Sequence, residues 1–204
     1  MDWYDLVLFA HILGVVGLFM ALAVELASLL GARRARTVEA VRVWSSAIKP
    51  LAIVFPVTSL LILAAGLTMT LGTWGWGHAW IDLSLALLVL LSILAATING
   101  AHAKRIAEQA AALGQGPIPP VLGHELNHPI HWMSVISIIM IALGIVFLMV
   151  EKPDWLGSAV TLVIALVVGV ILAQVLVRSS QTHVSVQDDK LAEERQTRVS
   201  PREE

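Results

Sequence analysis

Five long stretches of nearly unbroken apolar residues dominate this chain, and their length limits what it can fold into. They lie at about residues 4–30, 51–71, 80–101, 130–150 and 155–177. A helix needs about 20 residues to cross a hydrocarbon core of about 30 Å. Because lipid offers the backbone no hydrogen-bond partners, an apolar run of this length favours a membrane-spanning helix. We therefore predict an all-α fold, a polytopic membrane helix bundle with five transmembrane helices.

The distribution of basic residues predicts how the bundle is oriented. All thirteen Lys and Arg residues except Lys152 follow the first, third or fifth apolar stretch. They are Arg33, Arg34, Arg36, Arg42, Lys49, Lys104, Arg105, Arg178, Lys190, Arg195, Arg198 and Arg202. Basic connections are retained in the cytoplasm during insertion, so we expect an N-out/C-in multi-pass protein. The expected location is the bacterial inner (plasma) membrane.

The composition limits the kinds of chemistry and the kinds of partner that we expect for this chain. Only 14% of the residues are charged, against about 25% in a soluble domain. The absence of cysteine excludes disulfides, thiolate metal sites and thiol catalysis. We expect the lipid bilayer as partner and no nucleic acid, with a homodimer or a larger membrane complex left open.

Two parts of the chain differ in character. Residues 1–177 form the predicted five-helix transmembrane domain. Residues 178–204 mix charges with Ser, Gln and Thr and show no apolar periodicity, so we predict a disordered cytoplasmic tail.

His11 is the ionisable residue that lies deepest in a predicted span. Charged or ionisable side chains in a span are costly and often functional. Paired with His78 or Met69, His11 would supply ligands of the type that hold haem or copper. The structural alternative is a histidine that hydrogen-bonds a hydroxyl or carbonyl on a neighbouring helix.

A second candidate site lies at the predicted inner ends of the spans. Glu25, His102, His128 and His131 gather there in the expected topology, with His124 just before them. Imidazoles and a carboxylate can ligate a transition metal, and two histidines on facing helices can hold a haem iron. The alternative is that these groups face the wet interface, where Glu25 snorkels or pairs with a nearby arginine. No phosphate-binding loop or nucleophile–base pattern stands out, so no catalytic residue is assigned and enzymatic activity is left open.

Two segments carry a resemblance to known proteins. They are LFAHILGVVGLFMALAVE (Leu8–Glu25) and GTWGWGHAW (Gly72–Trp80). With them the chain resembles a family of small uncharacterised bacterial integral-membrane proteins, loosely akin to copper-resistance D-type proteins and HemJ-type haem-binding proteins. In the haem-binding relatives a histidine early in the first span is an iron ligand, and the resemblance implies this role for His11.

These patterns favour one function and leave two others open. The leading hypothesis is that bundle histidines bind b-type haem or a copper ion in a redox or metal-handling role. One alternative is a non-catalytic membrane partner or assembly subunit. The other is a small transporter or proton relay that uses Glu25 and the inner histidines, which with five spans would require a dimer.

Overall fold

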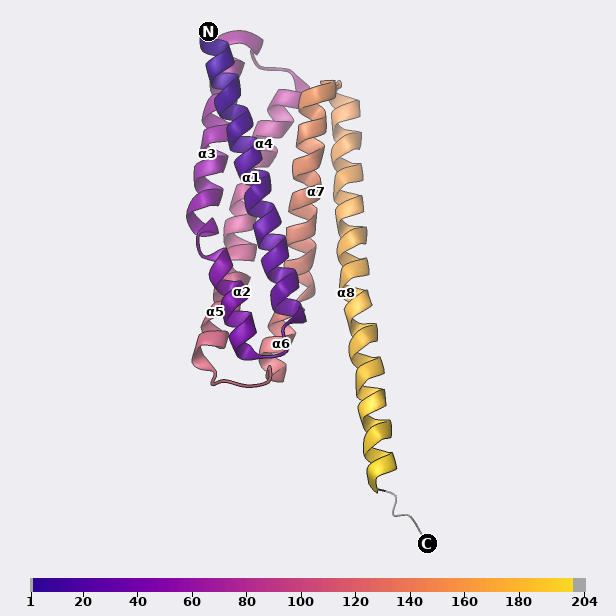
Figure 1. Ribbon diagram of the computed structural model, residues 1–204. Coiled ribbons are helices and arrows are strands. Elements are labelled where there is room, and N and C mark those ends of the chain that lie inside the picture. The colour runs from indigo at the N-terminus through magenta and orange to yellow at the C-terminus, as the bar shows by residue number, and fades with distance from the viewer. Residues whose placement is uncertain (1, 200–204) are drawn as a thin grey trace.

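The computed structural model describes residues 2–199, with side chains as far as Arg178, and shows helices joined by short loops (Figure 1). The α-helices are α1 (Trp3–Arg34), α2 (Val38–Ile48), α3 (Leu51–Met69), α4 (Ala79–Leu94), α5 (Gly100–Ala112), α6 (Pro120–Leu126), α7 (Pro129–Glu151) and α8 (Trp155–Val199). Two short π-helical segments, η1 (Thr70–Trp74) and η2 (Ala95–Asn99), continue α3 and α4.

The predicted five-span helical bundle is confirmed. Within the described residues, five helical segments are long and apolar enough to cross a membrane, and α1, α3, α4, α7 and α8 carry them. The third span departs most from the expectation, because α4 continues through η2 and α5 to Ala112 instead of ending near residue 101. The extension is amphipathic and packs against α2 and α6, so the helix continues beyond the apolar stretch.

The structure does not test the prediction of a disordered C-terminal tail. The backbone of α8 runs on to Val199, whereas the fifth span was expected to end near residue 177. Side chains after Arg178 lie outside the described part of the chain. A disordered tail over residues 178–204 therefore stays a prediction.

Close helix contacts depend on glycines. Gly14 on α1 faces α3 so closely that an added Cβ would lie 2.8 Å from Ile62 Cγ1. At Gly169 on α8 an added Cβ would lie 2.9 Å from the Cα atom of Ser137 on α7. Small residues at such positions let membrane helices approach closely, where lipid provides no hydrophobic drive for association.

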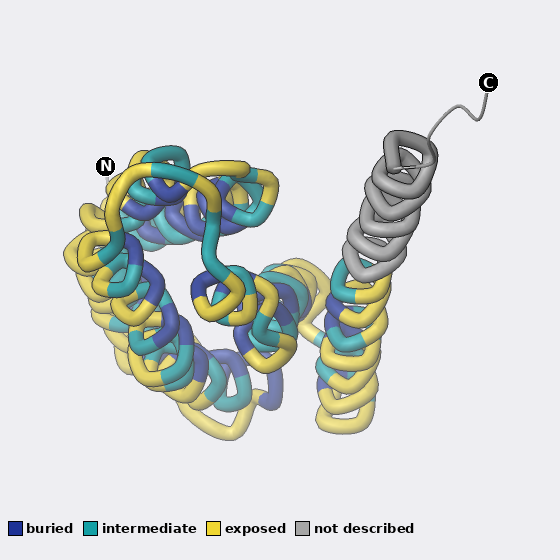
Figure 2. Tube along the Cα trace, turned by 90° about the horizontal axis from the view of Figure 1, so that it is seen from below, coloured by how far each residue is buried: buried dark blue, intermediate teal, exposed yellow. Residues whose placement is uncertain are grey.

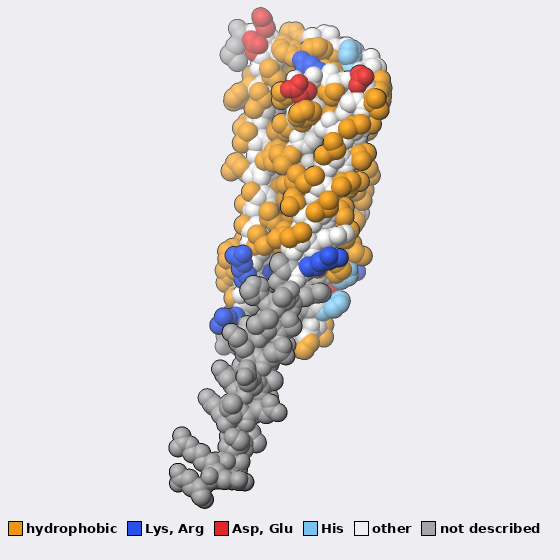
Figure 3. All heavy atoms as spheres, turned by 90° about the vertical axis from the view of Figure 1, so that its right-hand side faces the viewer, with side chains coloured by type: hydrophobic (Ala, Val, Ile, Leu, Met, Phe, Trp, Pro, Cys, Tyr) orange, Lys and Arg blue, Asp and Glu red, His pale blue; other side chains and the backbone are white. Residues whose placement is uncertain are grey.

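Four of the helices, α1, α3, α4 and α7, surround a central space, and α8 lies outside them against α7 (Figure 2). Figure 3 shows hydrophobic side chains covering the middle of one face, with basic side chains gathered towards one end. We call the end that carries Tyr4, Trp74 and Lys152 the tryptophan end. The end that carries His102 and His131 is the histidine end.

A small apolar core closes the histidine end. Val41 of α2, Ala110 of α5 and Leu122 of α6 are fully buried there against one another. Arg42 joins two of these helices, because its Nε donates to the Ala110 carbonyl at 2.7 Å and its Nη2 donates to the Leu113 carbonyl. These bonds satisfy carbonyls that the C-terminus of α5 leaves without helical partners. This core holds α5 and α6 in place, and both helices carry histidines.

Candidate functional site

A cavity of about 850 Å³ lies between α1, α3, α4 and α7. It runs from Tyr4 and Trp74 at the tryptophan end to Glu25 and Asn99 towards the histidine end. Most of its lining is apolar, with leucines, isoleucines, valines and phenylalanines from all four helices. Its volume falls in the range of pockets that enclose small-molecule ligands, about 300–1,000 Å³.

Polar groups without partners lie at the histidine end of this cavity. Glu25 and Asn99 are only 5% and 3% exposed, and both line the cavity. The Asn99 amide interacts with the Glu25 carboxylate, although Glu25 Oε2 and both amide atoms of Asn99 lack a hydrogen bond of full geometry. Asn99 can donate to Glu25, but the amide oxygen and the second carboxylate oxygen only accept and cannot bond each other. A buried polar atom without a partner costs about 1–3 kcal/mol, so these oxygens require an explanation.

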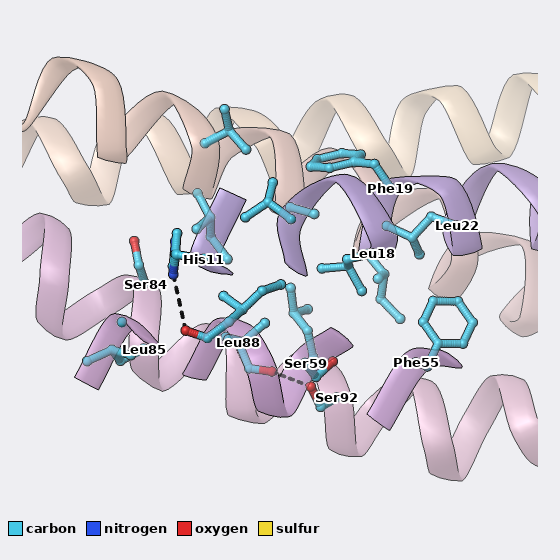
Figure 4. A pocket seen from close by; sticks show the side chains of 18 of the residues that line it. His11, Leu18, Phe19, Leu22, Phe55, Ser59, Ser84, Leu85, Leu88 and Ser92 are labelled. Carbon is cyan, nitrogen blue, oxygen red and sulfur yellow. Dashed lines mark hydrogen bonds between the residues drawn. The ribbon is translucent and has the colours of Figure 1, made fainter. Parts of the chain in front are cut away.

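His11 lies in the wall of the cavity nearer the tryptophan end (Figure 4). Its Nδ1 donates to the Ile62 carbonyl of α3 at 3.2 Å. A carbonyl only accepts, so Nδ1 carries the proton and Nε2 keeps its lone pair. The bond is the one expected for a structural histidine, and it also leaves one nitrogen free for a ligand.

Side chains of α1 and α7 that line the cavity are also exposed on the outside of the bundle. The two helices pack together towards the histidine end, where Leu29 lies against Trp132 and Val135. Nearer the tryptophan end, Ile12 and Val16 of α1 line the cavity and are still 51% and 49% exposed. Val150 on α7 also lines it and is 70% exposed. Exposed apolar side chains at this depth face lipid, so part of the cavity lining lies at the lipid-facing surface.

A separate cluster of imidazoles lies at the histidine end. The ring centroids of His102 and His131 are 5.0 Å apart, and those of His102 and His128 are 4.7 Å apart. His124 meets His128 edge-on at 5.9 Å. His102 Nδ1 lies 2.6 Å from Glu125 Oε1, and both side chains are largely buried. Three elements, α5, α6 and α7, thus bring four histidines and a carboxylate together.

The structure distributes the sequence-predicted residues over three places. His11 and Met69 line the cavity together, whereas His78 is exposed beside Trp80, with a ring-centroid distance of 6.3 Å. Gly75 and Gly77, with φ of 76° and 91°, turn the chain in the loop before His78. Glu25 lines the cavity beside Asn99 and does not belong to the imidazole cluster formed by the predicted ligands His102, His128 and His131.

Two polar residues gain a role that the sequence analysis did not assign. Glu125 pairs with His102, and Asn99 faces Glu25. Glu125 stands inside the histidine-rich run HELNHPIH (residues 124–131), so a carboxylate close to several imidazoles was visible in the sequence. Within the described residues, no three His, Asp or Glu side chains already converge on one metal position.

Fold and site together define a small multi-pass integral membrane protein with a cavity between its apolar helices. The chain belongs to the family described as predicted integral membrane protein (DUF2269), which matches residues 5–153. No curated protein and no solved structure matches the chain. A wider kinship with copper-resistance D-type and HemJ-type proteins is not part of the family match and stays a prediction.

Proposed function

We propose that the protein binds a long-chain amphipathic molecule of the membrane, with the chain in the cavity and a hydroxyl-bearing head at Glu25 and Asn99. The observation that carries the proposal is the group of polar atoms of Glu25 and Asn99 that lack full hydrogen bonds at one end of a mostly apolar cavity. Asn99 offers a donor and an acceptor, and Glu25 offers a further oxygen. A hydroxyl group both donates and accepts, so it can satisfy this arrangement.

Access from the bilayer supports this class of ligand. Ile12, Val16 and Val150 line the cavity and are exposed to lipid, so a membrane-dissolved molecule would enter beside them without crossing water. The chain of the ligand gains no hydrophobic free energy by moving from lipid into an apolar cavity, because both surroundings are equally apolar. Selectivity therefore depends on the head group and on its hydrogen bonds to Glu25 and Asn99.

The proposal is tested by identifying the molecules that copurify with the full-length protein. We expect one hydroxyl-bearing long-chain species in stoichiometric amount, enriched over the surrounding membrane when extracts are compared by mass spectrometry. Ser59 lines the cavity on α3, so Ser59→Phe should fill it and displace this species (Figure 4). The matched control Leu60→Phe changes the adjacent residue, which is 66% exposed, and should retain the species.

The head-group contacts are tested separately. Glu25→Ala and Asn99→Ala should each remove the enrichment while leaving the cavity open. An extract of the wild-type protein with the same lipid composition as the bulk membrane would refute the proposal. So would enrichment that both variants leave unchanged.

A second candidate ligand for the same cavity is haem b, and the tautomer of His11 favours it. The free Nε2 of His11 is the atom that would ligate the iron, with Nδ1–H fixed by the Ile62 carbonyl in the manner of metal-bound histidines. Met69 lies one turn after Gly66 on α3 and lines the same cavity, and an added Cβ at Gly66 would be 3.5 Å from His11 Cε1. Lys152 also lines the cavity and could pair with a carboxylate.

Haem would supply a redox-active iron within the membrane, as the sequence hypothesis expected. Protein expressed with a haem supply should then show a Soret band that shifts on reduction, and His11→Ala should abolish it. A spectrum without such a band would refute the haem proposal.

We also propose the N-out/C-in orientation in the bacterial inner membrane. Basic side chains concentrate at the histidine end, and this bias predicts that this end faces the cytoplasm.

A further inference from the structure

We infer that His102, His128 and His131 form a binding site for one divalent transition-metal ion, with Glu125 orienting His102 from outside. The site lies at the histidine end, is built by α5, α6 and the start of α7, and is separate from the cavity. It differs from the set expected from the sequence, because Glu125 takes part and Glu25 does not.

The spacing of the rings fits a shared ion. Two imidazoles that bind one zinc ion at about 2.1 Å in a tetrahedral arrangement have ring centroids about 5 Å apart. His102 lies at this spacing from His131, 5.0 Å away with 13° between the stacked ring planes, and from His128, 4.7 Å away with 37° between the planes. The described side chains do not converge on one point, so binding requires His128 and His131 to turn while Glu125 holds His102. His128 precedes Pro129 at the N-cap of α7 and is only half-buried, which leaves its ring room to turn.

Ring nitrogens without hydrogen-bond partners indicate where the metal ion would bind. His131 is 2% exposed, and its Nε2 is buried without a hydrogen-bond partner. The same holds for His128 Nδ1. Buried polar atoms without a hydrogen-bond partner are rare in native proteins unless a water molecule or an ion binds them. Both atoms belong to rings that stand beside His102.

Glu125 prepares His102 as a ligand. Its Oε1 accepts a hydrogen bond from His102 Nδ1 at 2.6 Å, so Nδ1 is occupied and Nε2 is the nitrogen that would bind the metal. This carboxylate–histidine arrangement is the usual outer support of a metal-bound imidazole. The pair is largely enclosed, at 9% and 12% side-chain exposure, so little water competes for these positions.

The ligand set selects the kind of ion. Neutral imidazoles suit zinc, copper or nickel, whereas calcium and magnesium require oxygen ligands. The chain has no cysteine, so thiolate does not contribute to the site. Three protein ligands leave a fourth position for water or an external group.

Metal titration of the full-length protein tests the inference. The protein is purified with an affinity tag that contains no histidine. After chelator treatment, we expect one equivalent of Zn²⁺ by elemental analysis and a tetrahedral absorption spectrum with Co²⁺. His102→Ala and His131→Ala should abolish stoichiometric binding. Glu125→Gln should weaken the affinity about 10–100-fold while the protein stays folded.

Two controls make the result decisive. His78→Ala, at the tryptophan end, should leave binding unchanged. His128→Ala changes a half-buried residue and should fold even if the fully buried histidines prove necessary for stability. The inference is overturned if the wild-type protein binds less than stoichiometric metal, or if folded His128→Ala and Glu125→Gln proteins bind it as tightly as the wild type. Neither outcome bears on the cavity ligand, which is detected by mass spectrometry.

Discussion

His102 and Glu125 meet through one hydrogen bond of 2.6 Å between residues that are 23 positions apart in the chain. The bond ties α5 to α6 across the loop that joins them. Hydrogen bonds that involve a charged group contribute about 1.5–3 kcal/mol, and Glu125→Ala also leaves His102 Nδ1 without its acceptor. We expect this variant to lower the thermal unfolding midpoint in detergent.

The exposed pair Lys104–Glu108 is the control for this prediction. Its atoms are 3.8 Å apart, and both side chains are mostly exposed. Such surface pairs contribute little, so Glu108→Ala should leave the unfolding midpoint unchanged. Equal effects of the two substitutions would show that the His102–Glu125 bond does not stabilise the fold.

The packing of α7 on α8 predicts a destabilising glycine substitution. An added Cβ at Gly169 would lie 2.9 Å from Ser137 Cα, so Gly169→Ala must push the two helices apart. Overpacking of this kind costs about 1–3 kcal/mol. Gly123 in α6 has open space around it, so Gly123→Ala should instead stabilise the protein by about 0.5–1 kcal/mol. Unfolding midpoints of the two variants should therefore shift in opposite directions, and a shift of the same sign would contradict this packing.

Arg33 joins three parts of the bundle at the histidine end. Its Nε donates to Asn127 Oδ1 at 2.9 Å and its Nη2 to the Leu176 carbonyl at 3.0 Å, while the guanidinium lies 4.7 Å from the Trp132 ring centroid. Arg33→Lys keeps the charge but loses the planar fork, so we expect destabilisation even by this substitution. The neighbouring Arg34 is exposed, and Arg34→Lys should be neutral in the same unfolding assay.

The orientation is testable because the chain contains no cysteine. Single cysteines introduced at exposed positions report their side through a membrane-impermeant maleimide. In intact spheroplasts, we expect Thr73→Cys at the tryptophan end to be labelled and Gln115→Cys at the other end to be protected. Labelling of Gln115→Cys before permeabilisation would reverse the proposed topology.

The spans were predictable from the sequence because the length of an apolar run is a local property. The extent of α5 was not, since its continuation to Ala112 depends on packing against α2 and α6 and on the bonds that Arg42 donates. In the same way, the cavity depends on where its helices approach closely, as α1 and α3 do at Gly14, and apolar periodicity does not specify that contact.

The types of residue at the sites could be identified from the sequence, but the residues that lie next to them in space could not. His11 was recognised as a buried histidine, yet its acceptor, the Ile62 carbonyl, is 51 positions away on another helix. His78 was a reasonable partner for His11 by residue type, and the structure places it outside the cavity lining. Glu25 was expected beside the inner histidines because the predicted topology gives the depth of a residue in the membrane but not the direction of its side chain. In the structure the Glu25 side chain lies next to that of Asn99.

The central claim is that Glu25 and Asn99 hold the head of a membrane molecule, and an experimental density map of the protein purified without added ligand tests it most directly. We predict elongated density in the cavity that ends within hydrogen-bonding distance of the Glu25 carboxylate and the Asn99 amide. A cavity closed by side chains would contradict the account. So would density confined to the exposed part of the lining at Ile12, Val16 and Val150, with nothing bound at Glu25 and Asn99.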